Sequence, residues 1–154
     1  MEVLCIGIGN AYRQDDSVGL YVAEALQERN LPGVKVSLHS REGISLINAW
    51  EGAQAVILVD AVISGAAPGT VYQFYADRQP LPIDCFPRST HTISVTEAVE
   101  LARQLGKLPD ICIVYGIEGA SFDPGTDLTP AAAASVPLLV DMIAQTIESL
   151  DDDR

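Results

Sequence analysis

The chain has 154 residues, which suits one compact domain and is too short to suggest two. Apolar residues make up 48% of it and charged residues 19%, a composition that argues against a disordered or fibrous protein. The formal net charge of -12 would repel nucleic-acid phosphates and anionic lipid headgroups, so we expect neither nucleic acid nor a membrane as a partner.

The predicted elements alternate between strands and helices from one end to the other. Strands are predicted at residues 3–8, 34–38, 55–59, 70–75 and 111–115, and helices from Val18 to before Pro32, at 43–50, at 94–105 and after Thr129. The run at 70–75 is aromatic and β-branched, and we expect it to be an extra strand, antiparallel at an edge. This alternation predicts a three-layer α/β fold, with a mostly parallel sheet of about five strands and helices on both faces.

Helix boundaries are marked by specific residues. Ser94 and Glu97 match a capping box, and Gly106 should end that helix. Thr129 should cap the last helix, in which Pro137 should produce a kink or mark a later start.

The two chain ends bear on location and domain organisation. The N-terminal segment lacks the basic region of a signal peptide, and no run approaches the roughly 20 apolar residues of a membrane span. We therefore predict a cytoplasmic protein with a single domain over residues 1–150 and a frayed acidic tail over 151–154. Because no exposed apolar stripe stands out, we expect a monomer.

The three cysteines do not suggest a disulfide framework or a cysteine protease. Cys5 and Cys112 lie in strand-like runs and are expected to be buried as small hydrophobic residues. Cys85 lies in a proline-marked loop where it could be exposed, but it has no neighbouring base in sequence.

The loop after the first strand favours a cation rather than a phosphate. A dinucleotide-binding loop would have glycine at position 12, where this chain has Tyr12. Asp15 and Asp16 would then stand at a helix N-terminus, where their negative charge opposes phosphate binding. We therefore expect this loop to accept a cation or hydrogen-bond donors, and we expect no organic cofactor.

Asp60 and His91 are the other candidate ligands. Asp60 follows a predicted buried strand, where the alternative role is a helix cap or loop anchor, and His91 precedes a helix, where the alternative is a structural hydrogen bond. If both converge with Asp16, two oxygens and one nitrogen would leave open positions on Zn, Ni or Fe(II). No Gly-x-Ser-x-Gly motif is present, and Ser17 and Ser94 are better explained by helix starts than by a serine triad.

These residues also carry a resemblance to a known family. The sequence resembles the [NiFe]-hydrogenase maturation endopeptidases, whose fold is phosphorylase/hydrolase-like. The matching motifs are Gly7-x-Gly9-Asn10 with Asp15-Asp16-x-x-Gly19, Val-Asp60-Ala-Val, Ser-Thr-His91-Thr-Ile-Ser, Gly116-Ile117-Glu118, and Gly125-x-Asp127-Leu128-Thr129-Pro130.

The resemblance implies both a reaction and its site. The reaction would be a single cut that removes the C-terminal extension of a hydrogenase large-subunit precursor after nickel insertion. The family's metal positions are matched by Asp16, Asp60 and His91, which would be the catalytic residues that recognise the metal. The nickel itself would belong to the substrate. The alternatives are a related peptidase of the same fold, such as a spore-protein protease, and a metal-dependent chaperone that binds without cleaving.

One segment departs from the family pattern. Many members carry an Asp-Gly-Gly-rich segment after the second strand, whereas this chain has His39-Ser40-Arg41-Glu42-Gly43. Arg41 and Glu42 either take over contacts made by that segment or are exposed loop residues. The identity of the substrate hydrogenase is left open by this difference.

Overall fold

Five strands form one sheet in the order β2-β1-β3-β5-β4. In chain order they are β1 (Val3–Gly9), β2 (Val34–Ser40), β3 (Ala55–Val62), β4 (Val71–Tyr75) and β5 (Ile111–Glu118). The pairs β1–β2, β1–β3 and β3–β5 are parallel, and β4 pairs with β5 in the antiparallel sense at the edge. The predicted sheet, including its antiparallel edge strand, is confirmed in this computed structural model, which describes residues 2–41, 45–82, 84–87 and 93–152.

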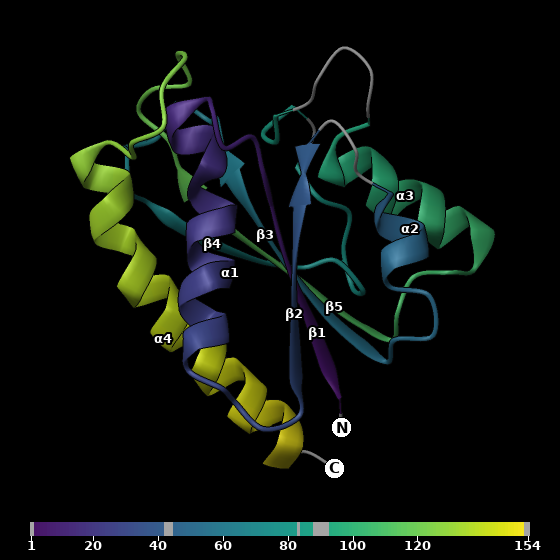
Figure 1. Cartoon of the computed structure of the whole chain (residues 1–154). Coiled ribbons are helices and arrows are strands. Elements are labelled where there is room, and N and C mark those ends of the chain that lie inside the picture. Colours follow the sequence, from purple (N-terminus) through teal and green to yellow (C-terminus); the bar gives the residue numbers. More distant parts are fainter. Residues whose placement is uncertain (1, 42–44, 83, 88–92, 153–154) are drawn as a thin grey trace.

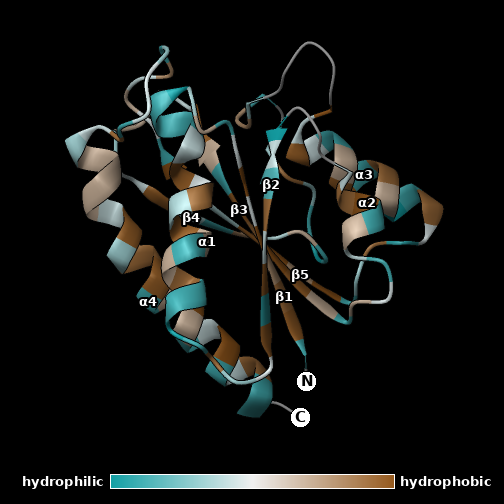
Figure 2. Cartoon of the chain, in the orientation of Figure 1, coloured by the Kyte–Doolittle hydropathy of each residue, from teal (hydrophilic) through white to brown (hydrophobic). Residues whose placement is uncertain are grey.

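Helices cover both faces of the sheet (Figure 1). Helices α1 (Val18–Glu28) and α4 (Pro130–Asp152) lie on one face, and α2 (Leu46–Ala49) and α3 (Val95–Leu105) lie on the other. Apolar side chains fill both interfaces, and the central strands β1, β3 and β5 are hydrophobic along most of their length (Figure 2). The predicted three-layer α/β fold is therefore confirmed.

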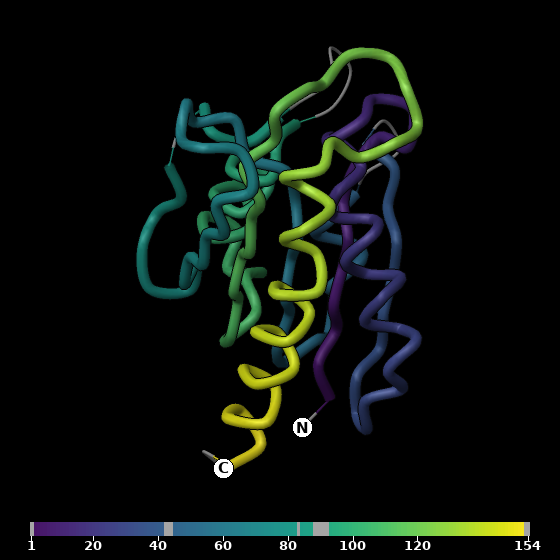
Figure 3. The backbone as a smooth tube through the Cα atoms, turned by 90° about the vertical axis from the view of Figure 1, so that its left-hand side faces the viewer, coloured from purple at the N-terminus to yellow at the C-terminus, as the bar shows by residue number. Residues whose placement is uncertain are grey.

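The direction of chain winding changes between β1 and β3. The first crossover leads from β1 to β2 on one side, and the second returns to β3 on the other side of β1. In parallel sheets of this kind, ligands bind beyond the carboxyl ends of the strands at such a switch point. In Figure 1 these ends point upward, and Figure 3 shows the segment between β5 and α4 arching over the same end of the molecule.

The predicted start and end of α3 are confirmed. The Ser94 side chain accepts a hydrogen bond from the amide of Glu97, whose carboxylate in turn accepts one from the Ser94 amide. Gly106 ends the helix with a left-handed φ of 70°.

Helix α4 is longer and less interrupted than expected. It continues from Pro130 to Asp152 with Pro137 inside it, so the expectation of a later helix start was wrong. It also includes Asp151 and Asp152, which were expected to fray. Its length and mean hydropathy of 1.3 would suit a membrane span. However, Leu139 and Ile143 are fully buried in the core beneath it, as expected of a helix packed on a sheet.

The cysteine predictions are largely confirmed. Cys5 and Cys112 are buried, and burial raises the pKa of each thiol to about 12. Cys85 is half-buried and not freely exposed.

Candidate metal-recognition site

Two glycines place Asp16 at the switch point. Asp16 lies in a short 3-10 helix, η1 (Gln14–Ser17), between β1 and α1. A Cβ atom added at Gly9 would lie only 2.2 Å from the backbone oxygen of Asp16. A Cβ atom added at Gly19 would lie 2.4 Å from the backbone oxygen of Val59 in β3. The glycines of the first loop thus allow η1 and α1 to pack directly on β1 and β3.

Asp60 enters the same region from β3. The strand continues beyond Asp60 to Val62, so the carboxylate projects from the strand itself and not from the loop after it. Its Oδ1 atom accepts a hydrogen bond of 2.8 Å from the amide of Ala61. Asp60 is fully buried, and its carboxylate also pairs with Arg41 in the segment after β2.

Arg41 joins the two carboxylates. It directly follows β2, and its exposed fraction is 5%, compared with 6% for Asp16 and 0% for Asp60. Its Nη2 atom lies 2.5 Å from Oδ1 of Asp60 and 2.9 Å from Oδ1 of Asp16. Its Nε donates to Oδ2 of Asp16 at 3.1 Å, and its Nη1 donates to Oδ2 of Asp60 at 3.2 Å. Two acids far apart in the sequence therefore share one nitrogen atom as a partner.

The position of Arg41 corrects one alternative from the sequence. An exposed loop residue was one of its two expected roles, and its burial excludes that role. Its Nη1 atom also donates a hydrogen bond of 2.8 Å to the carbonyl oxygen of Pro87. Nothing in the residue pattern marked Arg41 as buried, because an arginine after an edge strand is usually exposed.

The electrostatics of the site reflect burial opposed by this cation. Burial raises the pKa of Asp60 to about 6, although Arg41 favours its charged form. The pKa of Asp16 is also raised, mainly by burial, against the opposing effect of Arg41. Burial by itself would lower the pKa of Arg41, but the two carboxylates outweigh it and raise the pKa. The two carboxylates and the guanidinium are thus held close together and shielded from water.

One carboxylate oxygen at the site accepts no hydrogen bond from any residue that the structure describes. Among the described residues, no donor meets hydrogen-bond geometry at Oδ1 of Asp16, although Nη2 of Arg41 lies nearby. Buried carboxylate oxygens are normally satisfied, and a bound ion or a catalytic role is among the explanations for an exception. Oδ1 of Asp16 and the carboxylate of Asp60 are the oxygen donors expected for a borderline transition-metal ion, so the two residues fit such an ion.

Asp15 has a different role from its neighbour. Its carboxylate accepts hydrogen bonds from the amide and hydroxyl of Thr129 and from the amides of Ala120 and Ser121. These bonds fasten the segment before α4 onto η1. Asp15 therefore binds hydrogen-bond donors of the kind predicted for this loop, while Asp16 binds a cationic side chain, the guanidinium of Arg41.

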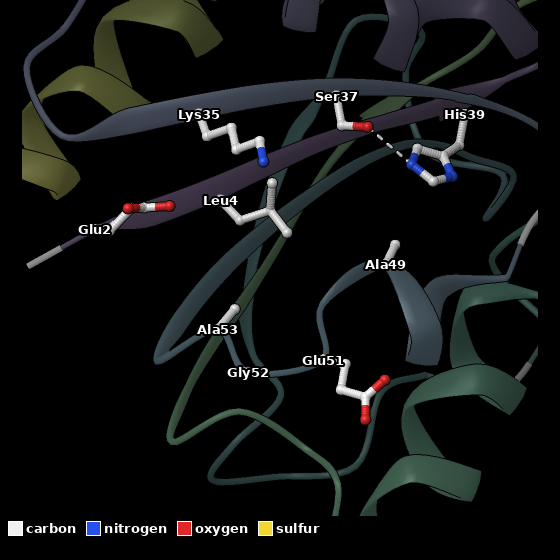
Figure 4. A pocket seen from close by; sticks show the side chains of 9 residues that line it. All are labelled: Glu2, Leu4, Lys35, Ser37, His39, Ala49, Glu51, Gly52 and Ala53. Carbon is white, nitrogen blue, oxygen red and sulfur yellow. Dashed lines mark hydrogen bonds between the residues drawn. The ribbon is translucent and has the colours of Figure 1, made fainter.

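The third expected ligand, His91, lies outside the residues that the structure describes, as does Glu42. The chain's other histidine, His39, lines a separate pocket between β2 and the end of α2 (Figure 4). Its Nε2 atom lies 2.9 Å from Oγ of Ser37, and neither Asp16 nor Asp60 lines that pocket. Within the described part of the chain, no group of three or more His, Cys, Asp or Glu residues is placed to hold a metal.

Comparison with known proteins identifies the family. The model of the hydrogenase maturation protease family matches residues 20–146. The hydrogenase 2 maturation protease of Escherichia coli is 28% identical over 97% of this chain and 93% of its own length. The hydrogenase expression/formation protein HupD of Thiocapsa roseopersicina is 28% identical over 92% of this chain, which spans 65% of that protein.

The fold agrees with this assignment. The solved structure of the hydrogenase maturating endopeptidase HybD from E. coli superimposes with a TM-score of 0.81 at 22% identity, covering 97% of this chain and 93% of that one. The family match extends over most of the chain and includes β3, which carries Asp60. On this evidence the chain belongs to the hydrogenase maturation protease family.

Proposed function

We propose that the protein is an endopeptidase that removes the C-terminal extension of a nickel-loaded [NiFe]-hydrogenase large-subunit precursor. In this proposal Asp16, Asp60 and His91 recognise the nickel, which the precursor supplies, and the protein needs no organic cofactor. The protein acts in the cytoplasm as a monomer, with the precursor as its partner. Family membership supports the processing of hydrogenase precursors, and the site supports the metal requirement.

The observation that carries the proposal is the meeting of Asp16 and Asp60 on one atom. Their Oδ1 atoms lie 2.9 Å and 2.5 Å from the same arginine nitrogen. A position that both carboxylates reach is the requirement for a shared metal ion. His91 belongs to the segment between Pro87 and α3, and Pro87 itself contacts Arg41 through its carbonyl oxygen.

The proposed chemistry follows from the ligand types. Two carboxylates and one neutral imidazole leave further positions on a Ni²⁺ ion for groups of the precursor. The ion held in this way would act as a template and as a Lewis acid on the scissile carbonyl or on a bound water. The same contacts would thus verify that nickel is present and position the bond to be cut.

The first experiment distinguishes an enzyme from a binding protein. Purified protein is mixed with nickel-loaded precursor and, separately, with nickel-free precursor, and the mass of the large subunit is measured. We expect shortening only of the loaded form. Stable co-purification without shortening would instead indicate a metal-dependent chaperone, and cleavage of both forms would contradict recognition of nickel.

The second experiment tests the ligands. We expect His91→Ala to reduce the processing rate by at least about 100-fold, the upper range for groups that only support metal ligands. His39→Ala is the matched control. Because His39 lies in the separate pocket of Figure 4, this variant should process the precursor at the normal rate. Asp60→Asn should also abolish processing, since it removes the ligand charge and keeps the side-chain shape. Normal processing by His91→Ala would remove that residue from the site.

A further inference from the structure

The guanidinium of Arg41 occupies the position that the two carboxylates share. Its three nitrogens contact Asp16, Asp60 and the carbonyl oxygen of Pro87, and its side chain is almost completely buried. If Asp16 and Asp60 bind a metal, as in the proposed function on which this inference rests, Arg41 must leave this position.

A metal bound by both carboxylates cannot coexist with this arginine position. Carboxylate oxygens bind transition-metal ions at about 2.0–2.2 Å. Nη2 of Arg41 already lies within 2.9 Å of one Oδ1 atom and 2.5 Å of the other. An ion that replaced these contacts would occupy the space of Nη2, and its positive charge would repel the guanidinium. Metal and Arg41 therefore compete for the same pair of oxygens.

The structure provides space into which the arginine side chain can move. Arg41 lines a cavity of about 560 Å³ beside the site, together with Tyr12, Leu38 and Pro124. Tyr12 and Leu38 are exposed, so the cavity opens to solvent. A long arginine side chain can rest its methylene groups on such apolar surface while its charged end reaches water.

We infer that Arg41 is an internal counter-ion that competes with metal for Asp16 and Asp60 and thereby determines which source of metal the site accepts. A free divalent ion must displace Arg41 by its own affinity alone. Nickel held by a precursor arrives with additional protein contacts, which contribute to the displacement. Arg41 thus makes the site discriminate against free metal and in favour of metal carried by the substrate protein.

The test measures the binding of free NiCl₂ to purified protein by calorimetry, without any precursor. We expect Arg41→Gln to bind Ni²⁺ at least about tenfold more tightly than the natural protein, because close buried charge pairs couple strongly. Arg13→Gln is the charge-matched control: Arg13 lines the same cavity and acts on Asp16 only through its charge, and among the described residues it makes no hydrogen bond or ion pair with either carboxylate. It should change affinity much less than Arg41→Gln does.

Further variants separate the possible failures. The gain in Arg41→Gln should disappear when Asp60→Asn is added. If that double variant keeps the gain, the ion binds elsewhere and the inference is wrong. Equal affinity in the natural protein and Arg41→Gln, with binding that still depends on Asp60, overturns the role of Arg41 but leaves the proposed site intact. Nickel binding in neither protein overturns the role of Arg41, and the processing of nickel-loaded precursor by the natural protein then decides the proposed function separately.

A second measurement applies if Arg41→Gln does not fold. Lysine keeps the charge of Arg41 but has one nitrogen instead of three, so it cannot hold both carboxylates in the same way. Arg41→Lys should therefore bind Ni²⁺ with intermediate affinity, and its melting temperature should rise more on adding NiCl₂ than that of the natural protein. A crystal structure with bound metal and an unmoved Arg41 would contradict the inference directly.

Discussion

Two adjacent aspartates in this protein have separate roles, set by what surrounds each carboxylate. Asp15 accepts hydrogen bonds from backbone amides and the Thr129 hydroxyl, whereas Asp16 faces Arg41 and Asp60. Burial by itself would raise the pKa of Asp15, but the hydrogen bonds from Thr129, Ala120 and Ser121 outweigh it and lower the pKa. One residue stabilises the loop, and its neighbour pairs with Arg41 at the proposed metal position.

This difference predicts how stability depends on pH. Asp15→Asn should lower the free energy of unfolding by about 1–3 kcal/mol at pH 7, because a buried hydrogen-bonding group loses its partner. Since the folded-state pKa of Asp15 is lowered, its stabilising effect is present above the unfolded-state value and is lost as pH falls through the folded-state value. The penalty, measured by urea unfolding, should therefore shrink below about pH 4.

A charge-matched control comes from the segment between β5 and α4, to which Asp15 is hydrogen-bonded. Asp123 is exposed, so Asp123→Asn should change stability by less than about 0.5 kcal/mol at either pH. A penalty for Asp15→Asn that is the same at pH 7 and pH 3 would show that the ionised form of Asp15 is not what stabilises the loop.

At the scale of elements, local sequence signals and their structures agree closely for α3. The Ser94 side chain and the Glu97 carboxylate satisfy free amides of the first turn, and Gly106 ends the helix. The local signal in α4, Pro137, was a poorer guide to where that helix begins. Pro137 lacks an amide hydrogen, yet the helix continues through it, because Leu139 and Ile143 beyond it are buried in the core.

The cap of α3 is directly testable. Ser94→Ala should lower the free energy of unfolding by about 0.5–2 kcal/mol, since the Glu97 amide loses its acceptor. Ser94→Gly is the matched control. It should lower the free energy of unfolding by only a few tenths of a kcal/mol relative to the natural protein, because glycine lets water reach the free amides. Chemical denaturation measures both, and an alanine variant as stable as the glycine variant would show that the cap contributes nothing.

At the scale of the whole molecule, the sheet separates two hydrophobic cores. Ile143 lies in the core under α1 and α4, and Ile6 lies in the core under α2 and α3. All eight residues of β3 are buried between these cores, so the strand that carries Asp60 belongs to both. The central position of β3 holds Asp60 in place relative to both helical layers.

This arrangement predicts additive effects from the two cores. Ile143→Val and Ile6→Val should each lower the free energy of unfolding by about 0.5–1.5 kcal/mol. Because the residues lie on opposite faces of the sheet, the double variant should lose the sum to within about 0.5 kcal/mol, in one unfolding transition. Two separate transitions in calorimetry would mean that the layers unfold independently.

Residue patterns along the chain were enough to predict the fold class and most helix and strand positions, and they made Asp16 and Asp60 candidate ligands. These follow from local causes: hydrophobic periodicity, caps and glycines that permit close packing. Tertiary structure decided that Asp16 and Asp60 meet on one nitrogen and that Asp15 faces the loop before α4. It also decided that Arg41 is buried between the acids. Such contacts depend on strand order and on the orientation of side chains distant in sequence, which no local pattern encodes.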